Sequence, residues 1–137
     1  MYEKCPDAHP RPHPLAVPAT TAAPTPDYTC VCTLTVQGLT IVELSGEIDL
    51  AGAGLVSTHL DQVTASNRPR ILVDLRRVSF IDAGGLGPLA RARDRALRRG
   101  GELSLVCTDP RILRTLRLAG LLPGFPLIPA PPRPHVG

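Results

Sequence analysis

The segment 82–87 is the part of the chain whose residue types are best suited to binding chemistry. It opens with an acid, Asp82, and continues with small residues, namely Ala83, Gly84, Gly85 and Gly87. Backbone N–H groups at the start of a helix attract anions, so a glycine-rich segment at such a place raises the question of a nucleotide site. The spacing fits neither G-x-G-x-x-G nor a Walker motif with its lysine. We therefore interpret the segment as a recognition loop whose glycines permit a sharp turn.

Other residues with reactive side chains lack the arrangement that catalysis or metal binding needs. Asp82 has no paired acid or base in its motif, and the chain offers no Ser–His–Asp set, so no enzyme activity is predicted. Cys5, His9 and His13 are ligand-like, but the prolines among them prevent the helix that would align their side chains. The sequence therefore predicts no metal and no other cofactor.

Arginines crowd one predicted helix, and their role depends on what faces them. They are Arg91, Arg93, Arg95, Arg98 and Arg99. A solvated helix face explains them most simply. Arg91 and Arg95 lie four residues apart, which sets like charges side by side at a small cost that a partner's acidic surface could offset. The chain has two Tyr, two Phe, no Trp and no base-reading motif, so direct nucleic-acid binding is not predicted.

The distribution of prolines separates a central domain from two tails. Of the 16 prolines, seven lie in residues 1–26 and six in residues 123–137. Proline cannot donate to helix or sheet hydrogen bonds, so we expect disordered tails at 1–26 and 129–137 around one domain at 27–128. No apolar run is long enough to cross a membrane, and no apolar stretch follows a basic one near the N-terminus. A cytoplasmic protein without membrane contact is expected.

Hydrophobic periodicity predicts alternating strands and helices. The strands are expected at Cys30–Val36, Thr40–Leu44, Ile71–Leu75 and Leu103–Cys107, with a candidate edge strand at Leu127–Ile128. Helices should follow Asp49, run from Gly85 to Arg99, and begin at Pro110. In the first helix Leu50 opens the apolar phase that should face the core. The order predicts an α/β sandwich with a mixed sheet of four to five strands and about three helices. The strand cysteines Cys30, Cys32 and Cys107 are expected to be buried free thiols.

The loop and two further motifs resemble those of a known family. Residues 78–87, VSFIDAGGLG, are similar to the signature loop of STAS domains, in particular of bacterial anti-sigma factor antagonists, which have Asp-Ser-Ser-Gly-Leu-Gly at this place. Residues 44–50, LSGEIDL, resemble the Gly-Glu-Leu-Asp turn of that family, and residues 118–121, LAGL, resemble its late Ser/Ala-Gly-Leu. The resemblance spans about residues 28–128 in the right order and spacing.

This resemblance implies a fold, a function and a set of contact residues. The fold is a STAS-type sandwich, here without the usual C-terminal helix because the final PAPPRPHVG cannot form one. The implied function is to bind an anti-sigma factor, a serine kinase of the GHKL type, and so to regulate sigma-factor-dependent transcription. The implied partner-binding residues are Glu47, Asp49, Asp82, Ala83, Gly84, Gly85 and Leu86.

The loop departs from the family at the residues that carry its switch. Members are phosphorylated on the second serine of Asp-Ser-Ser-Gly, and the two serine positions are Ala83 and Gly84 here. Neither has a hydroxyl, so the resemblance implies a degenerate phosphosite. Ser79, which precedes the loop, is expected to face inward. An aspartate at position 84 should weaken partner binding while stability stays level or rises, since acids suit helix N-termini.

Two alternatives remain open for a STAS domain without its switch. It could serve as a non-switching adaptor subunit of a larger signalling complex. It could also be a small-ligand or nucleotide-binding module that uses the glycine-rich loop. The partner found in the native host would separate the alternatives, because only an antagonist should bind a kinase-fold anti-sigma factor.

Overall fold

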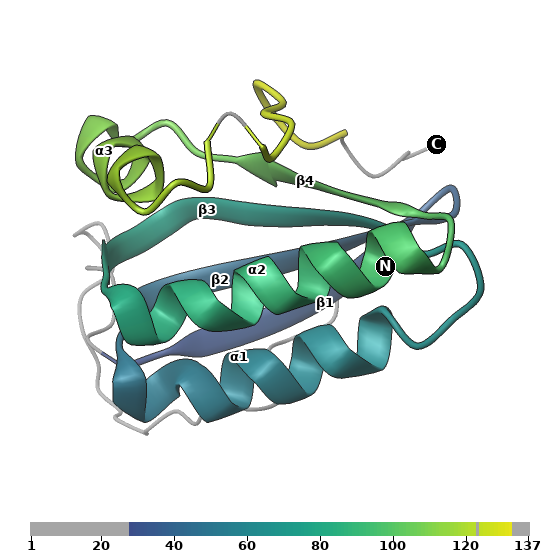
Figure 1. Cartoon of the computed structure of the whole chain (residues 1–137), viewed down its shortest axis with the longest axis horizontal. Helices are drawn as coiled ribbons and strands as arrows, with labels where there is room; N and C mark the ends of the chain where they lie inside the picture. Colours follow the sequence, from purple (N-terminus) through teal and green to yellow (C-terminus); the bar gives the residue numbers. More distant parts are fainter. Residues whose placement is uncertain (1–27, 123, 133–137) are drawn as a thin grey trace, which may run out of the picture.

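The computed structural model describes residues 28–122 and 124–132 of the chain. Its elements follow the order β1 (Cys30–Val36), β2 (Leu39–Ile48), α1 (Leu50–Val63), β3 (Arg70–Ile81), α2 (Ala83–Arg98), β4 (Glu102–Val106) and α3 (Pro110–Leu118). The strands form one sheet in the order β1-β2-β3-β4 (Figure 1). β1 and β2 are antiparallel, whereas β2, β3 and β4 run parallel to one another. The predicted α/β class, with a mixed sheet and three helices, is confirmed.

Two strands extend well beyond the apolar runs that predicted them. β2 runs to Ile48 rather than Leu44, and β3 runs to Ile81 rather than Leu75. The two strands pair in parallel as far as Ile48 opposite Ile81, with two irregularities of register on the way. Ladder hydrogen bonds need no apolar side chains, so pairing continues after the apolar stretches end. The extension brings both strand ends to the same edge of the sheet.

Helices α1 and α2 lie side by side against one face of the sheet (Figure 1). The core that they enclose includes the fully buried Leu60, Leu75 and Leu89. Parallel strands need a crossover connection, and α1 supplies it between β2 and β3. Helix α3 contacts β3 and buries Ile112 and Leu116 in the same core. The N-terminal ends of α1 and α2 consequently lie at the edge where β2 and β3 end.

The segment after α3 returns to the sheet at β4. Leu127 pairs with Leu105 in an isolated parallel bridge. The N–H of Leu105 donates to the Pro126 carbonyl at 2.9 Å, and the N–H of Ile128 donates to the Leu105 carbonyl at 2.8 Å. The candidate edge strand is therefore reduced to a single bridge. No helix follows α3 within residues 119–122 and 124–132.

The cysteine prediction is correct in part. Cys107 is a free thiol, and both Cys30 and Cys107 are partly exposed rather than buried. Cys32 is disulfide-bonded, so the expectation of a free thiol is wrong there. Partial burial raises the pKa of the Cys107 thiol above its ordinary value, because removal from water penalises the thiolate.

Some predictions fall on residues that the structure does not describe. Cys5, His9 and His13 lie outside the described residues, as do the tail 1–26 and the last part of the second tail, 133–137. Within the described ranges, no helix is both long and apolar enough to span a bilayer.

Candidate functional site

Two strand ends and two helix starts meet at one edge of the sheet. Ile48 ends β2 and Ile81 ends β3, and the two residues pair across the parallel ladder. An aspartate follows each strand, and a helix begins directly after it. The N–H of Asp82 donates to the Ile48 carbonyl at 3.3 Å, which ties the loop before α2 to the end of β2. The carboxyl ends of parallel strands are where α/β proteins place binding loops, so we take this loop edge as the candidate site.

The two aspartates cap the helices that follow them. A carboxylate oxygen of Asp49 accepts from the Gly52 N–H at 3.0 Å, and one of Asp82 accepts from the Gly85 N–H at 3.1 Å. Each of these N–H groups also donates to the main-chain carbonyl of the same aspartate, so the carboxylate adds a second acceptor in the first turn of its helix. The carboxylates also lie where a bound phosphate would approach, and they would repel it. The nucleotide alternative therefore finds no support at the loop edge.

The structure brings most, but not all, of the implied contact residues to the surface of the loop edge. Those that reach the surface in whole or in part are Glu47, Asp49, Asp82, Ala83 and Gly84. Gly85 and Leu86 are buried, and Leu86 belongs to the hydrophobic core. These two residues support the loop from beneath and are not placed to contact a partner.

Gly84 and Gly85 lie so close to neighbouring backbone that neither position has room for a side chain. A Cβ atom on Gly84 would lie 2.9 Å from the Cα of Leu50, the first residue of α1. A Cβ atom on Gly85 would lie 2.5 Å from the carbonyl oxygen of Ile48. A side chain at either position would have to push main chain aside, which close-packed interiors resist. Gly84, which the resemblance aligns with the phosphorylated serine of the family, thus lacks both a hydroxyl and the space for a side chain.

This packing changes the expected effect of an aspartate at position 84. The helix-dipole argument alone predicted level or increased stability. Because the Cβ of any side chain at Gly84 meets the main chain of α1, the substitution should instead destabilise the fold. The neighbouring Ala83 is exposed, so it accepts a charged side chain without that contact.

Three exposed residues beside the loop were missed or misplaced by sequence reasoning. Leu50 is 77% exposed, although its apolar phase placed it in the core. It is the first residue of α1 and follows the last residue of β2 by two positions, so the sheet no longer lies beneath it. Phe80 is 47% exposed, and Ser79 is exposed rather than inward-facing. Both residues follow Asp74, the last β3 residue that pairs with β4. At Ser79 and Phe80, β3 therefore has no β4 neighbour beside it.

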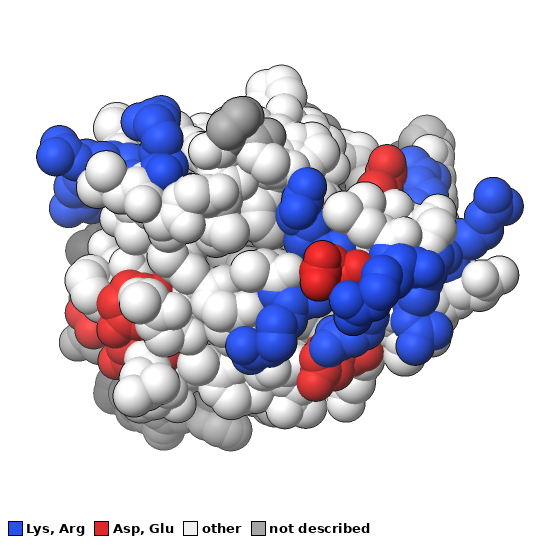
Figure 2. All heavy atoms as spheres, in the orientation of Figure 1, with Lys and Arg blue, Asp and Glu red and all other residues white. Residues whose placement is uncertain are grey.

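Acidic side chains gather near the N-terminal ends of α1 and α2, and basic side chains gather elsewhere on the same face (Figure 2). The α2 arginines are not merely solvated, since Arg95 pairs with Asp61 of α1 at 2.8 Å and Arg98 pairs with Asp94 at 3.1 Å. None of the ion pairs between described residues involves Asp49 or Asp82. The negative charge of the loop edge is therefore available to a partner.

Comparison with known proteins identifies the family. A sequence model of the STAS domain matches residues 32–133. The chain belongs to the STAS domain family. This STAS protein is 28% identical over 92 residues to the anti-sigma F factor antagonist of Paenibacillus polymyxa. The match covers 66% of this chain and 79% of the relative. This protein is also 28% identical over 96 residues to the anti-sigma-F factor antagonist RsfB of Mycobacterium tuberculosis, which covers 70% and 78% of the two chains.

Solved STAS structures share the architecture of this chain. An anti-sigma factor antagonist from Mycobacterium paratuberculosis matches with a TM-score of 0.70 at 29% identity, over 79% of this chain and 92% of that one. A putative anti-sigma factor antagonist from Thermotoga maritima matches with a TM-score of 0.64 at 22% identity, over 69% and 82%. The second likeness concerns the fold alone. The STAS assignment made from the three sequence motifs is confirmed.

Proposed function

We propose that this STAS protein is an anti-sigma factor antagonist, which binds an anti-sigma factor and so regulates sigma-factor-dependent transcription. The observation that carries the proposal is the exposed loop edge, where two capped helix starts meet at the family's signature loop. Curated relatives and a solved structure at 29% identity bear this functional name, which supports it. The role is regulatory binding rather than catalysis.

The finer details of the proposal rest on the resemblance of the loop. The partner is a serine kinase of the GHKL type, and binding takes place in the cytoplasm. Residues 27–128 form the binding unit, between tails at 1–26 and 129–137. We assign the partner contact to this unit because the signature loop and both helix starts lie within it.

The chemistry of the loop edge indicates what kind of surface the partner presents. The carboxylates of Glu47, Asp49 and Asp82 lie near two exposed apolar side chains, Leu50 and Phe80. A partner surface with basic groups around an apolar patch would complement both features. The aspartates are also helix caps, so a partner that pulled their side chains away would break the bonds that the carboxylates accept from the Gly52 and Gly85 N–H groups. The partner therefore binds the caps in place.

Capture of the partner is not reversed by phosphorylation of the loop. Ala83 and Gly84 offer no hydroxyl, and the main chain of Leu50 leaves no room for a side chain at position 84. A phosphate of about −2 charge would be needed to repel the partner, and neither Ala83 nor Gly84 can carry it. The amount of this protein, rather than its modification, would then determine how much anti-sigma factor is captured.

Calorimetric titration against the GHKL-type anti-sigma factors of the host tests the proposal. We expect saturable binding to at least one of them, and a loss of affinity of about tenfold or more in Leu50→Glu. Glutamate suits the first turn of α1, so that variant should keep its fold. The matched control is Leu118→Glu, the same change at a leucine of similar exposure on α3. Absence of binding to every such kinase, or equal losses in both variants, would refute the proposal.

The second candidate function is a non-switching adaptor in a signalling complex. The lack of space for a side chain at Gly84 is equally consistent with an adaptor and with an unregulated antagonist, because both functions do without the covalent switch. Affinity capture from the native host separates the two. If the parent protein captures a kinase-fold partner and Leu50→Glu does not, the protein is an antagonist. If the captured partner has another fold, the protein is an adaptor.

A further inference from the structure

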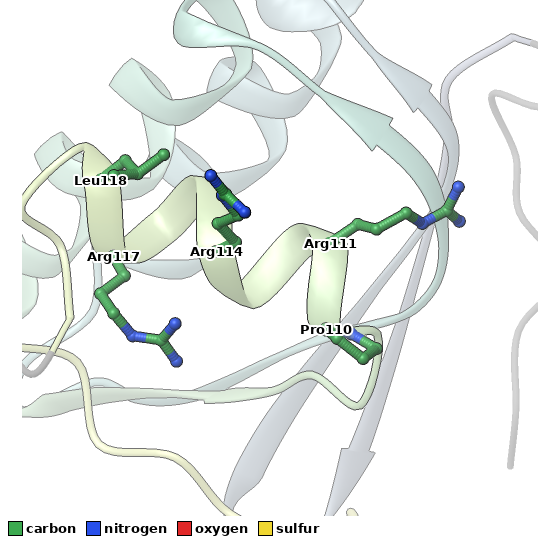
Figure 3. A pocket seen from close by; sticks show the side chains of 5 residues that line it. All are labelled: Pro110, Arg111, Arg114, Arg117 and Leu118. Atoms are coloured by element: carbon green, nitrogen blue, oxygen red, sulfur yellow. The ribbon is translucent and has the colours of Figure 1, made fainter.

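Helix α3 presents a basic outer face that nothing in the described structure covers. The helix buries Ile112 and Leu116. Its exposed surface carries Arg111, Arg114, Arg117 and Leu118; Figure 3 shows Arg114 and Leu118 projecting at one edge of the helix and Arg117 at the opposite edge. Leu118, at the end of the helix, is 76% exposed. The face therefore combines positive charge with an uncovered apolar side chain.

Two of the three arginine charges on this face are not paired with a carboxylate within the described part of the chain. Arg111 pairs with Asp109 at 3.0 Å, so its charge is already matched. Arg114 and Arg117 form no ion pair with a described carboxylate. Two guanidiniums on the exposed surface of α3 are thus left to an outside partner.

A wall formed by residues after α3 adds a second hollow beside this face. One hollow of about 540 Å³ is lined by Pro110, Arg111, Arg114, Arg117 and Leu118. A second hollow of about 500 Å³ shares Arg117 with it and is lined further by Leu122, Phe125, Pro126 and Leu127. The wall is fixed in place, because Pro126 and Ile128 bond to β4 and the Arg93 guanidinium lies 5.4 Å from the centre of the Phe125 ring. We call these two adjoining hollows the α3 groove.

We propose that the α3 groove binds an acidic amphipathic segment of a partner protein. Carboxylates of that segment would pair with Arg114 and Arg117, and its apolar side chains would cover Leu118 and Leu127, which is 47% exposed. The alternation of basic and apolar groups matches one face of such a segment. Nucleic acid fits less well, because Phe125 is buried and offers no stacking surface to bases. The groove does not include the loop edge, so the proposal stands apart from the function proposed above.

Titration of the full-length protein with a short helical peptide of Glu-Glu-Leu-Leu repeats tests this proposal. Amide NMR shifts should localise binding to α3 and residues 124–128. The charge-reversed variants Arg114→Glu and Arg117→Glu should each weaken binding about tenfold or more. The matched control is Arg91→Glu, an exposed arginine of α2 that forms no ion pair with a described carboxylate, and it should change the affinity less than twofold. Leu50→Glu at the loop edge should also leave peptide binding unchanged.

The outcomes that overturn the proposal are distinct from those that concern the loop edge. Equal losses of affinity in Arg91→Glu and Arg114→Glu would mean that the peptide responds to the net charge of the protein and does not bind the α3 groove specifically. Shifts confined to the loop edge would mean that the α3 groove is not the site. Tighter binding of a duplex oligonucleotide or of anionic lipid vesicles than of the peptide, lost in Arg114→Glu, would assign the arginines to another class of ligand.

Discussion

The loop edge and the α3 groove are both candidate binding surfaces, and they are built in opposite ways. At the loop edge Asp49 and Asp82 already serve as helix caps, and the chain at Gly84 and Gly85 lies against the main chain of earlier elements. At the α3 groove the guanidiniums of Arg114 and Arg117 lack described carboxylate partners. Close approach of main chains shapes the first surface, and unpaired side chains shape the second.

This difference determines how each surface responds to mutation. Crowding the loop edge should reduce stability and binding together, because the same packed atoms hold the fold and shape the surface. Changing charges in the α3 groove should alter binding alone, because exposed side chains without partners contribute little to the free energy of unfolding. Stability measurements can therefore separate the two kinds of surface.

Substitutions on the inner and outer sides of α3 should differ most in their cost to stability. Leu116 is 0% exposed and Leu118 is 76% exposed. Leu116→Ala should lower the free energy of unfolding by about 2–5 kcal/mol through lost contacts and a cavity. Leu118→Ala should change it by less than about 0.5 kcal/mol. Urea denaturation of the two variants measures both values, and a similar loss in each would mean that Leu118 is not a free surface residue.

The next effect concerns the backbone contact at the loop edge. Gly85→Ala should cost about 1–3 kcal/mol, because its Cβ meets the Ile48 carbonyl oxygen at 2.5 Å. The control is Gly54→Ala in α1, where a Cβ meets nothing within 4 Å. That change should raise stability by about 0.5–1 kcal/mol, since alanine is the better helix residue. Thermal and urea denaturation should show opposite signs for the two glycines, and equal signs would contradict the packing.

Neighbouring loop positions should differ in their tolerance of an acid. Gly84→Asp should lower the free energy of unfolding by about 1 kcal/mol or more, because its Cβ meets the Cα of Leu50. Ala83→Asp places the same charge one residue earlier on an exposed site, so its stability should stay within about 0.5 kcal/mol of the parent. Equal stability of the two variants would show that the start of α1 yields to a side chain at position 84.

The smallest effect distinguishes the paired arginine of α3 from the unpaired ones. Hydrogen bonds from the Arg111 side chain and N–H hold the pKa of Asp109 below its ordinary value of about 3.8. The stability gained from this carboxylate is therefore present above about pH 3.8 and is lost as the pH falls through the lower folded pKa. Carboxyl NMR titration should show a higher pKa for Asp109 in Arg111→Gln and no change in Arg114→Gln. A shift in both would mean that general charge, not pairing, sets the pKa.

Local sequence signals predicted the elements whose boundaries depend on local chemistry. Alternating residues gave the bounds of β1, Cys30–Val36, without error. The Asp109-Pro110 pair marked the start of α3 correctly, because an acid at the cap and proline in the first turn both favour a helix start. The signature motif likewise located the loop at Asp82. These features are set by residues near one another in the chain.

Features that depend on distant parts of the chain could not be predicted in this way. The extension of β3 past Leu75 arises from pairing with β2, and the two exposed arginines that follow hide it from a hydropathy pattern. The lack of space for a side chain at Gly84 arises from Leu50, which belongs to another element, α1. The second wall of the α3 groove arises from the return of residues 126–128 to β4. In each case a long-range contact decides the outcome.

We expect the loop of this STAS protein to bind its partner without a phosphorylation switch. The most direct test is to measure the affinity for a cognate GHKL-type anti-sigma factor before and after incubation of this protein with that kinase, Mg²⁺ and ATP, with mass spectrometry of the loop peptide. The expected result is the same affinity in both measurements and no phosphate on residues 79–87. Phosphate on the exposed Ser79, together with weakened binding, would contradict it, because the loop would then have a working switch.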